Sequence, residues 1–81
     1  MDFKDVLIEN MGRIHTTEMG LERIRKNLEL NDVDVVEYCK DVIKNKNSEV
    51  EKRGKNYYVY LEDKILTINS SSFTIITAHK K

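Results

Sequence analysis

The spacing of apolar residues changes once along the chain, from a helical period to a strand period. In the N-terminal half, apolar residues recur three and four positions apart, which is typical of amphipathic helices. They are Phe3, Val6, Leu7, Met11 and Ile14, then Leu21, Ile24 and Leu28, then Val35 or Val36, Cys39, Val42 and Ile43. From Ser48 the period is two, and short β-branched or aromatic segments alternate with turn residues.

This order predicts an α+β fold. Two to three N-terminal helices are expected to pack on one face of a three- to four-stranded antiparallel β-meander. Gly12 is expected to weaken or end the first helix. The expected N-caps are Thr16 or Thr17 for the second helix and Asn31 or Asp32 for the third, with Asp34 in its first turn.

Four segments are expected to form the meander: a charged edge strand at 48–53, then strands at 57–61, 65–69 and 73–79. In the last segment, strict alternation separates Thr74, Ile76 and Ala78 from Phe73, Ile75, Thr77 and His79. If the first set meets the helices, Thr77 and His79 stand on the open face of the sheet.

Length and composition indicate one small globular domain. The 81 residues suit a single domain, 1–81, with a helical part at 1–46 and a β-meander at 48–80. Hydrophobic residues make up 40% of the chain, charged residues make up 35%, and the formal net charge is zero. A sequence pI near 6.7 argues against a strongly basic, non-specific DNA-binding protein.

The cysteine count and the hydropathy pattern limit the metal sites, disulfides and cellular location that we expect. Cys39 is the only cysteine, so neither an internal disulfide nor a cysteine-rich metal site is expected. We predict no metal and no cofactor. No apolar run approaches the roughly 20 residues that span a bilayer, and the opening MDFKD lacks the apolar region of a signal peptide. A cytoplasmic protein without membrane contact is therefore expected.

The two histidines are the main candidates for chemistry. His15 and His79 each lie beside a threonine at a predicted element end. Because imidazole titrates near neutral pH, two histidines can serve as acid and base in metal-free RNA cleavage. Arg23 and Lys55 would stabilise the phosphorane, and Thr77 would position the phosphate. This mechanism requires the two imidazoles within roughly 10 Å of each other.

Three further residues are predicted to bind substrate. Thr17 and Asn69 could hold phosphate oxygens, and Tyr58 could stack on a nucleobase. Structural roles compete with each of these assignments. His15 could pack at a helix junction, His79 could be a solvated terminal residue, and a strand tyrosine commonly has a buried ring and a wet hydroxyl.

Several segments resemble a small bacterial family catalogued as a domain of unknown function. They are "IHTTEMGLERIRKNL", "VVEYCKDVIK", "RGKNYYVYL", "ILTIN" and "FTIITAHK", which together cover about Leu7 to Lys80. The chain more distantly resembles the barnase–EndoU–colicin–RelE superfamily of nucleases and toxins. That resemblance implies metal-free RNA cleavage on the open sheet face, at positions matching His15, Arg23, Lys55, Thr77 and His79.

Two functions follow as hypotheses. The first is a metal-independent ribonuclease of the toxin type, acting on RNA. The alternative is a non-catalytic protein-interaction or inhibitor module, of a kind that phages or mobile elements carry, with a protein partner or a second copy of the chain. Convergent His, Arg, Lys and Thr side chains on the open face would favour the nuclease, and a broad apolar patch would favour a partner.

Overall fold

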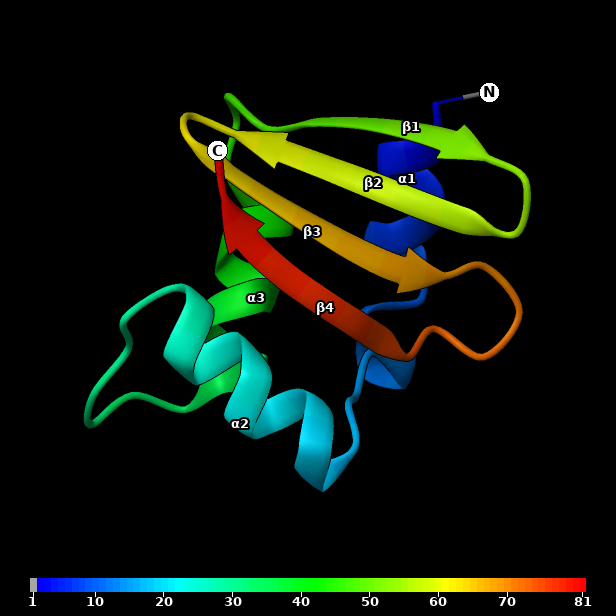
Figure 1. Cartoon of the computed structure of the whole chain (residues 1–81). Coiled ribbons are helices and arrows are strands. Elements are labelled where there is room, and N and C mark those ends of the chain that lie inside the picture. Colours follow the sequence, from blue (N-terminus) through cyan, green and yellow to red (C-terminus); the bar gives the residue numbers. More distant parts are fainter. Residues whose placement is uncertain (1) are drawn as a thin grey trace.

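The chain forms helices first and a sheet second, as the sequence predicts (Figure 1). The structure is a computed structural model, and it describes residues 2–81. Its helices are α1 (Phe3–Glu9), the 3-10 helix η1 (Met11–Arg13), α2 (Glu18–Asn27) and α3 (Val35–Lys44). Its strands are β1 (Glu49–Arg53), β2 (Asn56–Leu61), β3 (Lys64–Asn69) and β4 (Ile75–Lys80). The α+β prediction is confirmed.

Short polar side chains start each α-helix. The side chains of Asp2, Thr17 and Asp34 accept hydrogen bonds from backbone N–H groups of α1, α2 and α3, respectively. Thr17 was one of the two caps expected for α2. The prediction of Asn31 or Asp32 as the cap of α3 is wrong, because the helix begins after Asp34, which bonds the N–H of Glu37 at 3.1 Å.

The first helix is shorter than its apolar pattern suggests. Its C-cap is Asn10, whose side-chain Nδ2 donates to the Val6 carbonyl oxygen at 2.8 Å. The Asn10 backbone N–H donates to the same oxygen at 3.2 Å, so Asn10 caps the helix twice, and the helix ends before Gly12. The remaining apolar residues of the pattern, Met11 and Ile14, still pack against or within the core through η1 and its exit.

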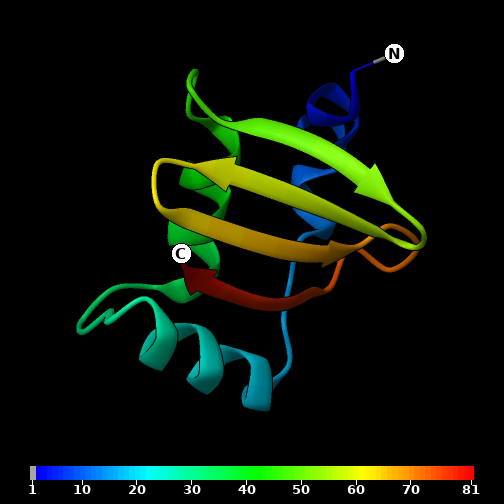
Figure 2. The ribbon, with the colours of Figure 1, turned by 45° about the horizontal axis from the view of Figure 1, so that its top comes forward.

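The four strands form one antiparallel sheet in the order β1-β2-β3-β4 (Figure 2). Tight turns join β1 to β2 and β2 to β3, whereas a longer loop joins β3 to β4. Gly54, with φ of 58°, occupies the left-handed position between β1 and β2, where glycine has no steric penalty. Glu62, with φ of 55°, takes the same conformation between β2 and β3.

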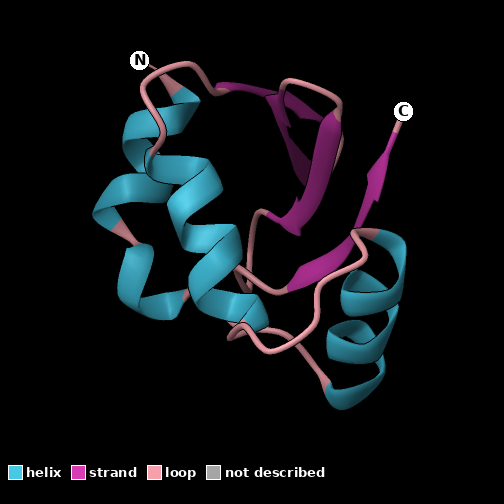
Figure 3. Ribbon diagram, turned by 90° about the vertical axis from the view of Figure 1, so that its left-hand side faces the viewer, coloured by secondary structure: helices cyan, strands magenta, loops and turns pink. Residues whose placement is uncertain are grey.

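The helices cover one face of this sheet and one of its edges. In Figure 3, α1 and α3 pack together on one face, while α2 lies beside β4. The core contains Leu7, Ile24, Val35, Cys39 and Ile43 from the helices, and Val59, Leu66, Ile68, Ile75 and Ala78 from the strands, all nearly or fully buried. The opposite face of the sheet carries no helix (Figure 1).

The side chains of β4 do not alternate strictly, so the predicted faces of this strand are partly wrong. Ile75 opposes Ile68 and Ala78 opposes Leu66, and all four are buried in the core. A register shift beside Thr67 and Ile68 inserts Ile76 as an extra residue. A β-bulge of this kind changes the side-chain phase, so Ile76, Thr77 and His79 all lie away from the core.

Two carbonyl oxygens of β4 accept hydrogen bonds from side chains of α2 and of the segment before it. The Thr16 hydroxyl donates to the Ile75 carbonyl oxygen at 2.8 Å, and Asn27 Nδ2 donates to the Ala78 carbonyl oxygen at 3.1 Å. His15 pairs with Thr74 as an isolated parallel bridge. Among residues 2–81, no helix has both the length and the apolar character needed to cross a membrane.

Candidate functional site

The uncovered face of the sheet, here the open face, places two tyrosines at its centre. Tyr58 and Tyr60 are two residues apart on β2, and both are half-buried. Tyr58 pairs with Thr67, which pairs with Thr77 on β4. Tyr60 lies in the next row, which continues through Ile65 to His79 on β4. The predicted residues Tyr58, Thr77 and His79 therefore share one surface.

Basic groups lie beside these rings. The Lys81 ammonium lies 5.8 Å from the centroid of the Tyr60 ring, within the range of a cation–π contact. On β1, Arg53 forms a salt bridge with Glu51. The pKa of Arg53 is raised, chiefly by this hydrogen bond and further by the phenol groups of Tyr60 and Tyr58. Glu51 lies opposite Tyr58 in the register of β1 and β2, so this ion pair lies beside Tyr58 on the open face.

The C-terminal end of β4 is tied to the end of α2. Lys80 Nζ lies 2.9 Å from the Glu29 carboxylate, and the pair raises the pKa of Lys80 and lowers that of Glu29. Both groups are exposed, so this pair contributes little to stability. It nevertheless joins the last residues of the strand to the helical layer and leaves His79 exposed on the open face.

His15 belongs to a different cluster, at the start of β4. Its Nδ1 lies 2.7 Å from the Arg13 carbonyl oxygen, and its Nε2 lies 3.0 Å from the Thr74 hydroxyl oxygen. Because a carbonyl can only accept, Nδ1 carries the proton. In the neutral ring, Nε2 then accepts a hydrogen bond from Thr74. The Ser72 hydroxyl extends this chain, 2.8 Å from the Thr74 hydroxyl.

The two histidines are not brought together. His15 contacts Thr74, and His79 lies five residues further along β4. At the rise of a β-strand this is roughly 15 Å, more than the roughly 10 Å within which two imidazoles can act on one phosphate. His15 therefore lies beside the start of β4, and His79 lies near the end of that strand.

Two other predicted residues, Asn69 and Lys55, lie at or beside the connections between strands. Asn69 Oδ1 accepts the N–H groups of Ser71 and Ser72, so this side chain shapes the loop before β4. Lys55 is exposed in the β1–β2 turn, where its carbonyl oxygen accepts the Ser70 N–H at 2.8 Å. The prediction did not include Thr74 as the partner of His15, because 59 residues separate them.

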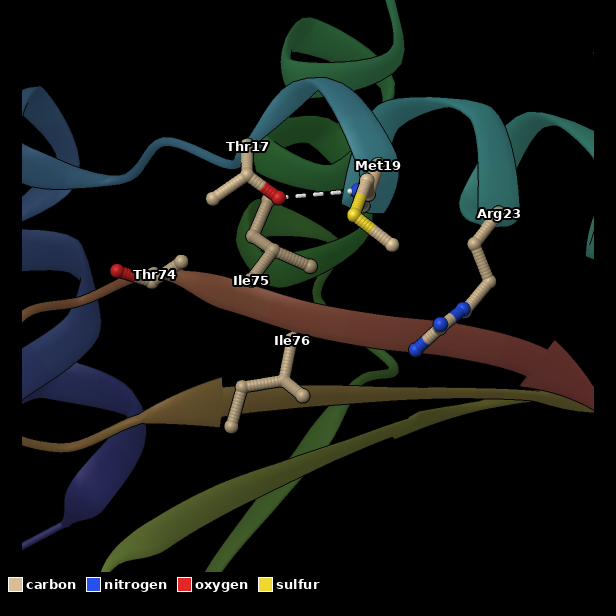
Figure 4. Close-up of a pocket in the computed structure, with 7 residues that line it drawn as sticks. Thr17, Met19, Arg23, Thr74, Ile75 and Ile76 are labelled. Atoms are coloured by element: carbon tan, nitrogen blue, oxygen red, sulfur yellow. Dashed lines mark hydrogen bonds between the residues drawn. The ribbon is translucent and has the colours of Figure 1, made fainter.

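A groove separates α2 from the start of β4 (Figure 4). It has a volume of about 290 Å³ and is lined by Thr17, Met19, Gly20 and Arg23 on the helix side and Thr74–Ile76 on the strand side. In Figure 4 the Arg23 side chain extends from α2 toward β4. The predicted residues Thr17 and Arg23 thus meet in this groove, and not around either histidine.

The described residues offer neither a reactive cysteine nor a cluster of metal-binding side chains. Burial raises the pKa of the Cys39 thiol to about 12, so the thiolate needed of a nucleophile is absent at neutral pH. Across residues 2–81, no three His, Cys, Asp or Glu side chains are grouped so that they could hold a metal ion.

Comparison with known proteins identifies a family for most of the chain. A search of curated proteins and a search of solved structures each gave no match. Residues 8–79 match the model of a family described as "Protein of unknown function (DUF3781)". Since this match covers most of the chain, including the histidine cluster and all of the sheet except Lys80, the chain belongs to the DUF3781 family.

Proposed function

We propose that the open face binds single-stranded RNA. The observation that carries this proposal is the position of Tyr58 and Tyr60 on one uncovered face of a central strand. Two residues of strand separate them by roughly 7 Å. Sheets with exposed aromatic residues bind single-stranded RNA by stacking successive bases on the rings.

Local charge supports RNA over a neutral ligand. Lys81 lies over the Tyr60 ring, the Arg53–Glu51 pair lies beside Tyr58, and Arg23 lies at the groove beyond β4. Two acidic residues on β1 lie opposite the rings, Glu49 opposite Tyr60 and Glu51 opposite Tyr58, and Glu51 is paired with Arg53. The Lys81 contact indicates that a face of the Tyr60 ring can receive a planar or cationic group. Since only a few basic side chains lie near the rings, few phosphates would be neutralised, and a modest dependence on salt is expected.

Cleavage of the bound RNA is a separate part of the hypothesis. The distance between His15 and His79 disfavours a mechanism that uses both on one phosphate. His79 shares the open face with Tyr60 and Thr77, so it is the histidine that bound RNA would meet. We therefore propose RNA binding as the primary activity, with His79 as the group to test for cleavage.

The test is fluorescence anisotropy with a labelled single-stranded RNA, using Tyr58→Ala, Tyr60→Ala and the wild-type protein. Tyr38→Ala is the matched control, because Tyr38 is also half-buried but lies on α3. Loss of one stacked base costs about 1–3 kcal/mol, a roughly 5- to 150-fold weaker Kd. Folded wild-type protein that binds no RNA, or equal binding by all variants, would refute the proposal.

The same RNA, incubated with protein in EDTA and separated on a gel, tests cleavage. Metal-independent products that disappear in His79→Ala but persist in His15→Ala would extend the function to a ribonuclease. Intact RNA with unchanged binding would limit the function to binding.

A protein-interaction module is the second candidate. Met19 is 74% exposed and Ile76 is 39% exposed, and both line the groove between α2 and β4. Exposed apolar side chains that cluster in this way are found at protein contacts. Self-association that is lost in Met19→Ser, in a protein without RNA affinity, would favour this function.

A further inference from the structure

The groove between α2 and β4 is continuous with the open face. The β-bulge turns Ile76 away from the core, so this side chain borders both the groove and the open face. Its neighbour Thr77 pairs with Thr67, which pairs with Tyr58. Two strand spacings, roughly 10 Å, separate β2 from β4. A ligand lying across the tyrosines toward β4 would therefore reach the groove.

The walls of the groove suit a flat apolar group. Met19 of α2 and Ile76 of β4 line the groove. Gly20 forms part of its floor, because the absence of a side chain lets the helix approach the Thr16 hydroxyl and the Ile75 carbonyl. The thioether of methionine is flexible and polarisable, and it makes favourable contacts with aromatic rings. A volume of about 290 Å³ can hold a ring with room for solvent.

The charge at the groove suits an anion attached to that ring. Arg23 forms no salt bridge with any acidic group between residues 2 and 81. Its guanidinium extends over β4, further along the strand than Ile76 (Figure 4). Guanidinium groups bind phosphate through paired N–H donors, which lysine cannot reproduce. An apolar slot beside one unpaired guanidinium matches one nucleotide, with its base in the slot and its phosphate outside.

Resting on the proposed function, we infer that this groove holds one unstacked nucleotide of the RNA whose other bases stack on Tyr58 and Tyr60. The base lies between Met19 and Ile76, and Arg23 binds an adjoining phosphate. The groove thereby selects single strands, because a paired base cannot leave its duplex without the cost of unpairing. The binding site then extends from the centre of the sheet to α2.

The experiment measures anisotropy with labelled oligouridylates of increasing length, at several salt concentrations. Arg23→Gln should weaken binding and reduce the slope of log K against log salt by about 0.7, the value for one phosphate contact in single strands. The matched control is Arg25→Gln, an exposed change of the same charge on the same helix, and its slope should equal that of the wild type. Met19→Ala should weaken binding about 2- to 12-fold and remove the affinity gained from the last nucleotide.

The outcomes separate this inference from the proposed function. RNA binding that depends on Tyr58 and Tyr60, but is unchanged in Arg23→Gln and Met19→Ala, would overturn the groove assignment alone. A wild-type protein that binds no RNA would overturn both. If Met19→Ala abolishes self-association in sedimentation velocity while RNA affinity is unchanged, the groove is a protein contact and the inference is wrong.

Discussion

The substitution Gly20→Ala tests directly how α2 packs against β4. Gly20 is buried in α2, where it faces the Thr16 side chain and β4. A Cβ at this position would overlap the Thr16 hydroxyl oxygen and lie 3.3 Å from the Thr17 hydroxyl oxygen. The Thr16 hydroxyl donates to the Ile75 carbonyl oxygen at 2.8 Å, so the new methyl group displaces a group that joins α2 to the strand.

Gly20→Ala changes the free energy of unfolding through one stabilising and two destabilising contributions. Replacing glycine by alanine inside a helix stabilises it by about 1 kcal/mol. Against this, overpacking costs about 1–3 kcal/mol, and losing the hydrogen bond between Thr16 and Ile75 costs about 1 kcal/mol more. The net expected loss is about 2 kcal/mol. For a domain of this size, that lowers Tm by roughly 8–16 °C.

Thermal and urea unfolding, followed by circular dichroism, measure this loss. Gly12→Ala is the matched control, because no atom lies within 4 Å of a Cβ built there. In a Thr16→Ala background the overlap is absent, so Gly20→Ala should become neutral or stabilising. If Gly20→Ala has the same effect with and without the Thr16 hydroxyl, the close approach of α2 to β4 is not what requires glycine.

Three other substitutions test separate contacts. Thr17→Ala removes the N-cap of α2 and should cost about 1 kcal/mol in urea unfolding, whereas Thr17→Ser should cost much less; equal losses would refute the capping role. Because burial raises the Cys39 pKa to about 12, the thiol should react with Ellman's reagent at pH 8 only through unfolding, and rapid labelling of the native protein would contradict its burial. The unfolded thiol ionises near pH 8.5 while the folded thiol keeps its proton, so stability should fall above about pH 9, less steeply in Cys39→Ala. Lys4→Met removes the hydrogen bonds from Lys4 Nζ to the carbonyl oxygens of Asn45 and Ser48, at 2.6 and 3.2 Å, and should cost about 1 kcal/mol; an unchanged urea midpoint would show that these bonds contribute nothing.

The parts of the fold that depend on neighbouring residues were predictable from the sequence. Thr17 caps α2 as expected, because the cap bond reaches only three residues along the chain. The buried row Val35, Cys39 and Ile43 follows from helical spacing alone. The charged edge strand β1 was also expected from its composition. Each of these features is set by local geometry, which the sequence expresses directly.

Features that depend on distant partners were not predictable in the same way. Phe73 has φ of 59°, a left-handed conformation that bulky residues rarely adopt, and the Arg13 guanidinium lies 4.6 Å from its ring centroid. This turn and the bulge at Ile76 shift the phase of β4, so strict alternation wrongly grouped Ile75 with Thr77 and His79. The contact between His15 and Thr74 likewise depends on how the finished sheet meets the helices.

The unequal edges of the sheet limit how the protein can assemble. At β4, hydrogen bonds from Thr16 and Asn27 already occupy strand carbonyls that an added strand would need. At β1, no other strand pairs along the outer side within residues 2–81. Polymerisation through sheet edges requires two available edges on each molecule, whereas this chain offers one. Edge pairing between copies would therefore join β1 to β1 in a two-fold pair, and growth would stop at two molecules, which excludes an edge-to-edge fibre.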